Sequence, residues 1–302
     1  MQSSPPTSPS FSDRTTSAGS LSIKSLFKRF KWRVSFTLSL VVGETLLELL
    51  YPLFIGLAIN DLLRDSFDGL IYLGILGVTA TLIGTARRFY DTRIYASMYQ
   101  TIAPELVEKE QSRNSSTSTI AARTNLLNEF VEFFENSIPA VVTSLLGLIG
   151  VLIIICTLNL KVFFACLGLI SLVILIYLVT GKLNYKLNAA YNSELEKRVN
   201  AIESANPRFI DSHFRSLMKW NIKLSDLETG NFFFIWIGII ALFIYTPIAA
   251  IDSSTTNYGL IFSLLMYVFD YIEKVATLPL FVQQIIRLKE IANRLRENNN
   301  QQ

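Results

Sequence analysis

Cysteine and histidine are scarce in this sequence, and its charge is nearly balanced. The 302 residues include only two cysteines and one histidine. Cys156 and Cys166 lie in apolar runs, so we interpret them as buried thiols rather than a disulfide or redox site. His213 has no second histidine near it and is interpreted as a packing residue. With a net charge of only +3 and no interleaving of basic and aromatic residues, we expect no metal, no catalytic residues and no nucleic-acid partner.

Apolar residues are abundant instead, at 51% of the chain. Several runs approach the roughly 20 residues that a helix needs to cross a bilayer. Lipid offers no hydrogen-bond partners to the backbone, and these runs lack the alternation of a barrel strand, so the spans should be helices. The sequence therefore predicts an all-α membrane protein with six transmembrane helices. The predicted spans cover approximately residues 34–59, 70–86, 138–157, 162–179, 232–251 and 258–286.

Two long polar segments, at about residues 87–137 and 182–230, separate these spans. Apolar residues recur in them at steps of three, four or seven, which indicates helices. In the second segment a break is expected at 204–207, because Pro207 disfavours helical geometry at the preceding residue. Each segment is thus predicted to be a helical hairpin whose arms of roughly 22 residues project about 33 Å.

The ends of the chain are polar. Residues 1–21 are rich in serine, threonine and proline and are predicted to form a disordered tail, and residues 297–302 form a polar C-terminal tail. The stretch 22–34 is amphipathic and is expected to lie among lipid headgroups. Nearly all lysine and arginine lies in the N-terminal region, the two hairpins and the C-terminal region. The distribution of positive charge therefore predicts that hairpins and termini are cytoplasmic.

Four strings have a familiar form: YPLFIGLAINDLL (51–63), RRFYDTRIY (87–95), SHFRSL (212–217) and KLSDLE (223–228). Together with six spans and two long hairpins, they make residues 22–296 resemble the transmembrane domain of ABC exporters. The strings resemble, more narrowly, a small bacterial family of free-standing six-transmembrane-domain ABC proteins. The resemblance implies a homodimer in the bacterial inner membrane whose hairpin tips dock on nucleotide-binding domains. The tip residues for such docking are Arg113, Ser116, Asn206, Pro207 and Arg208.

The sequence departs from the complete exporters in one respect. It contains no G-x-x-x-x-G-K-[ST] motif and nothing similar to LSGGQ, the segments that bind and sense ATP phosphates in that superfamily. It also ends shortly after the sixth predicted span. We therefore expect a non-enzymatic transporter subunit without a cofactor of its own, which uses ATP only through a separately encoded ATPase. The alternative is a membrane scaffold or regulator, or an ion-driven secondary transporter, that uses the same fold without ATP.

Ionisable side chains within the predicted spans are candidates for function, because each costs about 2.5 to 3.5 kcal/mol to insert. They are hypothesised to line a polar cavity that binds a cationic or zwitterionic solute or relays protons. Structural pairing is the alternative, since two of them are spaced four residues apart on one helix. The candidates are Glu44, Glu48, Asp270, Glu273 and Lys274.

A further group of charges lies at the predicted inner end of the second span. Its arginines are expected to reach lipid headgroups or to pair between helices, and its aspartate to pair with one of them. Glu48 is a second candidate partner for the first two arginines. The acidic residues before the third span, including Glu135, are interpreted as an exposed face. The group comprises Arg87, Arg88, Asp91 and Arg93.

Overall fold

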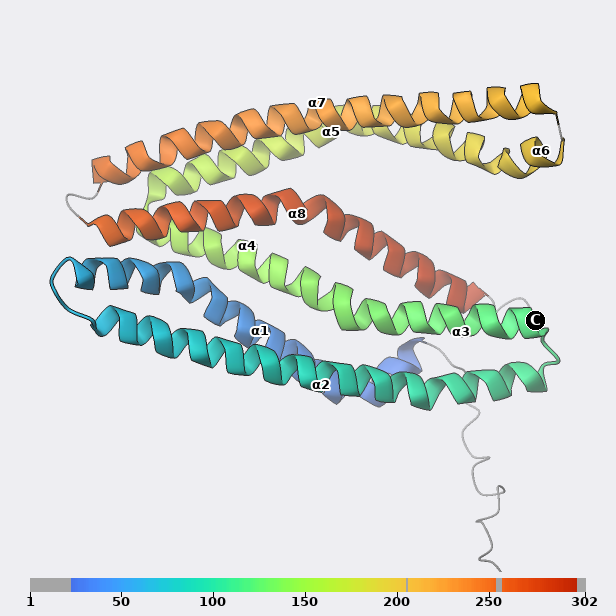
Figure 1. Ribbon diagram of the computed structural model, residues 1–302, viewed down its shortest axis with the longest axis horizontal. Coiled ribbons are helices and arrows are strands. Elements are labelled where there is room, and N and C mark those ends of the chain that lie inside the picture. The colour runs from blue at the N-terminus through green and yellow to red at the C-terminus, as the bar shows by residue number, and fades with distance from the viewer. Residues whose placement is uncertain (1–22, 205, 254–256, 298–302) are drawn as a thin grey trace, which may run out of the picture. The chain divides into compact units, whose positions relative to one another are not determined.

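The chain folds into long helices. The computed structural model describes residues 23–204, 206–253 and 257–297, with side chains described for 30–204, 206–251 and 257–277. All regular structure within these ranges is helical, which confirms the predicted fold class, and the predicted tails lie outside them apart from Glu297. The elements, shown in Figure 1, are α1 (Ile23–Leu62), α2 (Asp68–Ser112), α3 (Thr117–Glu132), the π-helical turn η2 (Phe133–Ser137), α4 (Ile138–Leu158), α5 (Leu160–Glu196), α6 (Arg198–Glu203), α7 (Pro207–Ser253) and α8 (Tyr258–Glu297).

Within the described residues, five helical segments are long and apolar enough to cross a membrane. The sixth predicted span, 258–286, falls on α8, which is a continuous helix but is not among these five. The predicted number of six spans is therefore supported only approximately. The five segments are Phe30–Leu62, Asp68–Ser112, Thr117–Leu158, Leu160–Glu203 and Pro207–Ile251.

Large apolar side chains remain exposed along these segments. Ile153, Leu178 and Ile248 are among those that present more than half of their surface. In water such a surface would favour association or aggregation, whereas in a bilayer it contacts lipid tails at no cost. The exposed apolar surface is therefore that of a multi-pass membrane protein.

The described chain divides into two compact units, and each is treated by itself. The first comprises residues 23–45, 79–144 and 278–297, and the second comprises residues 46–78 and 145–277. Because α1 and α2 each contribute to both units, these units do not follow the order of the chain.

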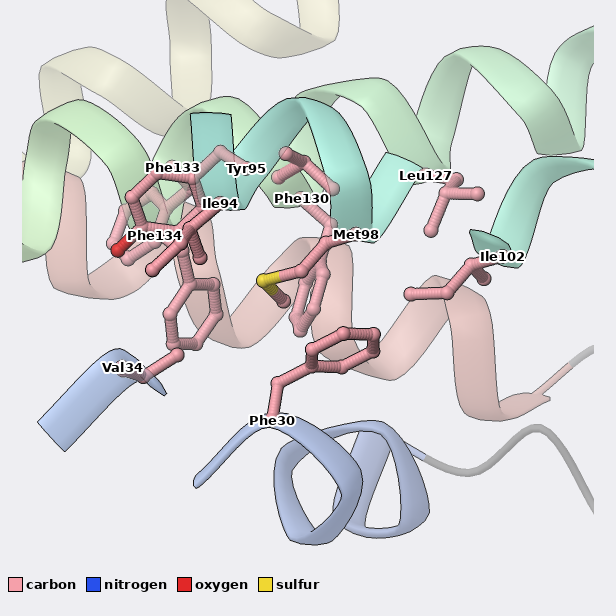
Figure 2. Packing of buried hydrophobic residues seen from close by; sticks show 11 residues of the cluster. Phe30, Val34, Ile94, Tyr95, Met98, Ile102, Leu127, Phe130, Phe133 and Phe134 are labelled. Atoms are coloured by element: carbon pink, nitrogen blue, oxygen red, sulfur yellow. The ribbon is translucent and has the colours of Figure 1, made fainter. Parts of the chain in front are cut away.

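The first unit has a core of aromatic and aliphatic side chains. Figure 2 shows Tyr95 and Met98 of α2 packed against Phe130 and Phe134, which lie on α3 and η2. The rings of Phe130 and Phe134 are 4.8 Å apart between centroids. Most of this core lies in the first hairpin, past the predicted second span, where burial from water can stabilise it. The hairpin is therefore a packed structure rather than two separate helices.

The amphipathic N-terminal stretch forms the beginning of α1, without a break before the first span. We expected it to lie among headgroups, but Phe30 is only 6% exposed and joins Val34 in the core of the first unit. At these two positions the stretch packs against the hairpin, and the side chains of residues 23–29 lie outside the described ones.

The second unit is organised around the long pairing of α5 with α7. Two buried tyrosines of α8 form hydrogen bonds to neighbouring helices. Tyr267 Oη donates to the Leu49 carbonyl of α1 at 2.6 Å. Tyr271 Oη donates to the Cys166 carbonyl of α5 at 2.5 Å. Both cysteines are free thiols, as predicted, but only Cys166 is buried and Cys156 is half-buried. Because a phenol buried in an apolar interior needs a partner, these bonds fix the rotation of α8 within the unit.

Candidate functional site

A buried charge cluster lies in the first unit, between α1 and α2. Arg87 Nε donates to Glu44 Oε2 at 2.5 Å, and Arg87 Nη1 donates to Asp91 Oδ2 at 3.2 Å. The side chains of Arg87, Glu44 and Asp91 are 18%, 16% and 7% exposed, respectively. The guanidinium of Arg87 thus bridges the two carboxylates, and all three groups are largely shielded from solvent. The predicted pairing of Asp91 with an arginine is found at Arg87, whose second partner is Glu44.

Gly84 makes room for this cluster. It lies one turn before Arg87 on α2, and a Cβ at this position would come within 2.5 Å of Glu44 Oε1. Such a distance is far below van der Waals contact, so any larger residue would displace the Glu44 carboxylate. The absence of a side chain at Gly84 therefore allows Glu44 to approach α2 closely.

The other predicted members of this group do not join the cluster. Arg93 Nη1 donates to the Phe89 carbonyl at 2.9 Å, and its guanidinium lies over the Phe89 ring at 5.0 Å. Arg88 is exposed, and so is Glu48, which belongs to the second unit. The i, i+4 spacing of Glu44 and Glu48 therefore does not give the two glutamates the same environment.

The remaining predicted cavity residues lie on α8, in the second unit. Lys274 Nζ and Asp270 Oδ1 form an ion pair at 2.8 Å, with side chains 19% and 30% exposed. The aliphatic part of Lys274 packs on Gly147 of α4, where a Cβ would lie 2.3 Å from Lys274 Cε. Glu273 is exposed. The geometry shows the pairing that was the alternative to a solute site, and a role for these residues in transport stays a prediction.

The tip of the first hairpin is closed by a buried carboxylate that we did not single out from the sequence. Glu110, whose side chain is 2% exposed, forms an ion pair with Arg123 on α3 and a second, at 3.5 Å, with Arg113. Ser115 Oγ also donates to Glu110 Oε2 at 2.9 Å. Asn114 completes the turn in the left-handed region, with a φ of 56°, which asparagine tolerates. Glu110 thus ties the end of α2 to α3.

Replacing Glu110 with alanine should loosen this tip. The variant loses charged hydrogen bonds worth about 1.5 to 3 kcal/mol, so amide hydrogen exchange in the Glu110–Arg123 region should become faster. Replacing the exposed Glu108 with alanine is the matched control and should leave exchange unchanged. Equal exchange in the two variants would show that Glu110 does not close the tip.

The second hairpin contains a comparable contact between α5 and α7. His213 is 3% exposed, and its Nδ1 lies 2.9 Å from Glu194 Oε1. Lys197 Nζ donates to the other Glu194 oxygen at 3.1 Å. The hydrogen bond from Lys197 lowers the pKa of Glu194, and the contact with His213 lowers it further. The prediction that His213 is a packing residue agrees with its burial, but its side-chain contact with Glu194 was not foreseen.

Most of the predicted tip residues have local structural roles. Ser116 caps α3 by accepting from the Thr119 amide at 3.2 Å, and Asn206 Oδ1 accepts from the Arg208 amide at 3.1 Å at the start of α7. Pro207 is the first residue of α7, where a missing amide hydrogen costs nothing. The side chain of Arg208 is exposed beyond this cap. Docking on a partner stays a prediction for all of these residues.

A comparison with known protein families identifies the family that has this arrangement of long helices and packed hairpins. Residues 23–259 match the family described as the ABC transporter transmembrane region. The chain belongs to this family. As an ABC transporter transmembrane region it is a multi-pass membrane protein and a transporter membrane subunit, in agreement with the resemblance seen in the sequence. A search of curated proteins gave no match.

Proposed function

We propose that this ABC transporter transmembrane region forms the solute pathway of a transporter whose ATPase is encoded separately. The observation that carries the proposal is the pair of helical hairpins, at the α2–α3 and α5–α7 turns, within a chain of this family. The 302 residues contain no phosphate-binding G-x-x-x-x-G-K-[ST] motif, so this stretch would not itself bind ATP through such a loop.

The side-chain contacts between the two arms of each hairpin support a role in coupling. A hairpin transmits movement from its tip only if its two arms move together. In the first hairpin Glu110 ties α2 to α3, and in the second the pair of Glu194 and His213 ties α5 to α7. We propose that both tips contact the ATPase, with Arg208 as an exposed contact residue.

The assembly is proposed to be a homodimer in the bacterial inner membrane, with both termini in the cytoplasm. The resemblance implies that six helices form only half of an exporter pathway, so a second copy would complete it. Native mass spectrometry of the purified protein should therefore give the mass of two copies. A monomer under conditions that preserve other membrane complexes would contradict this part of the proposal.

The experiment that tests the function is copurification followed by an ATPase assay. The tagged chain is extracted from its native membrane under mild conditions, and bound polypeptides are searched for a P-loop sequence. We expect such a subunit to copurify and to hydrolyse ATP. An Arg208→Glu variant should lose it, because the reversed charge opposes docking, whereas Lys219→Glu, about three turns along the same helix and also exposed, should retain it.

The two alternatives are distinguished by the same preparation. If no ATPase copurifies and proteoliposomes take up solute on a proton or sodium gradient, the chain is a secondary transporter. If no ATPase copurifies and no transport occurs, it is a scaffold or regulator. Either result would overturn the proposed function.

A further inference from the structure

The buried cluster around Arg87 carries more negative than positive charge. Glu44 and Asp91 contribute two carboxylates, and Arg87 contributes the one guanidinium that contacts them. Glu135 of η2 is half-buried and close enough to Asp91 for their charges to interact. With all groups ionised, the two carboxylates that contact Arg87 already exceed its single positive charge, and Glu135 adds a further negative charge near Asp91. Burying unbalanced charge is costly, so the site favours uptake of a positive charge.

Two buried polar atoms of the cluster lack a hydrogen bond of normal geometry. They are Thr37 Oγ1 of α1 and Asp91 Oδ1 of α2, for which no partner is found among the residues that the structure describes. The Thr37 hydroxyl is nevertheless close enough to the Asp91 carboxyl to interact with it. Thr37 is 0% exposed and Asp91 is 5% exposed, so water does not readily satisfy them. An unfilled bonding position therefore exists on the Asp91 oxygen that does not contact Arg87.

The surroundings hold this position in place. Gly84 lets Glu44 approach Arg87, and Tyr95, which is 1% exposed, lies near both Asp91 and Glu135. Glu135 belongs to the π-helical turn η2, which interrupts the regular helix between α3 and α4. Such turns are rare and are frequently found at functional sites. Glu132, on the last turn of α3, adds a further negative charge near Glu135.

We propose that this cluster is a proton-binding site, in which Asp91 takes up one proton on Oδ1 and donates it to the Thr37 hydroxyl. The proton comes from water, the O–H bond forms on Asp91, and one negative charge is removed from the site. Glu44 keeps its pairing with Arg87. Among the described residues no three acidic, histidine or cysteine side chains converge as metal ligands do, whereas a proton requires only one acceptor oxygen.

This inference goes beyond the proposed function and does not depend on it. The site lies wholly in the first unit, and it requires neither a particular solute nor an ATPase. Failure to find an ATPase would leave the proton site standing, and failure to find the proton would leave the proposed function standing.

Infrared difference spectroscopy on the full chain in lipid nanodiscs tests the proposal. Spectra recorded across a pH titration should contain the C=O stretch of a buried protonated carboxylic acid, which disappears at alkaline pH. Asp91→Asn should abolish this band, whereas Asp226→Asn, at an exposed position on α7, should leave it unchanged. No such band in the unaltered protein, or its persistence in Asp91→Asn, would overturn the proposal.

A second variant keeps the test decisive if Asp91→Asn fails to fold. Valine has nearly the same shape as threonine but cannot accept a hydrogen bond from the protonated Asp91 carboxyl. Thr37→Val should therefore shift the C=O band to higher frequency. An unshifted band would contradict the geometry proposed here. The titration is then repeated with choline in place of sodium, and the band should keep the same pH dependence. A band that responds to sodium instead would show that the cluster binds a metal cation rather than a proton, which would contradict the proposal.

Discussion

An Arg87→Ala variant is expected to lose about 3 to 5 kcal/mol of stability, the range measured when one partner of a buried ion pair is removed. Glu44 and Asp91 would keep their buried positions but lose the guanidinium that bonds to both of them. Equilibrium unfolding in mixed detergent micelles measures the loss. Because acidification neutralises carboxylates, the difference from the unaltered protein should shrink as the pH falls.

Arg88→Ala is the matched control for this variant. Arg88 is the next residue of α2 and is exposed, so its removal should change the free energy of unfolding by less than about 0.5 kcal/mol. Adding Glu44→Gln to Arg87→Ala should recover part of the loss, because one uncompensated charge is removed. Similar unfolding of Arg87→Ala and Arg88→Ala would show that the cluster contributes no stability.

A Phe130→Ala variant should be about equally damaging, at about 3 to 5 kcal/mol. Phe130 is 3% exposed in the core of the first unit, where its removal leaves a cavity between α2 and α3 (Figure 2). Hydrogen exchange should become faster along α2 around Tyr95 and Met98. Exchange in the α5–α7 pair, which belongs to the other unit, should remain slow.

Phe209→Ala provides the comparison for Phe130→Ala. Phe209 lies on α7 in the second hairpin and is 48% exposed, so its truncation creates no cavity. If both phenylalanine variants were equally stable, the first hairpin would not have the packed core described above.

The helices and hairpins were predictable from the sequence because their signals are local. Apolar runs, helical periodicity and the break at Pro207 each depend on residues within a few turns of one another. The family could be recognised for the same reason, since its strings are contiguous. The sixth predicted span is not among the five segments long and apolar enough to cross a membrane, and its described part, residues 258–277, carries Asp270, Glu273 and Lys274.

The pairing of the charges was not predictable in the same way. Glu44 and Arg87 are 43 residues apart, and only the packing of α1 on α2 brings Glu44 into contact with the arginine. The ion pair of Glu110 with Arg123 crosses a turn whose geometry depends on Asn114. Glu135 was interpreted as exposed because the regular period of α3 places it so, whereas the π-helical turn leaves it half-buried near Asp91. A π-helical turn is a local irregularity of the backbone, and the spacing of apolar residues in the sequence does not indicate it.

The central claim is that the hairpin tips work on a separate ATPase, and photocrosslinking in the native membrane tests it most directly. A photoreactive amino acid is placed at Thr117 in one tip or at Arg208 in the other, with Lys219 as the control position on the arm. The account predicts that both tips crosslink to a polypeptide that carries a P-loop sequence and that Lys219 does not. Crosslinks from neither tip to such a polypeptide, in cells where the chain is assembled in the membrane, would contradict it.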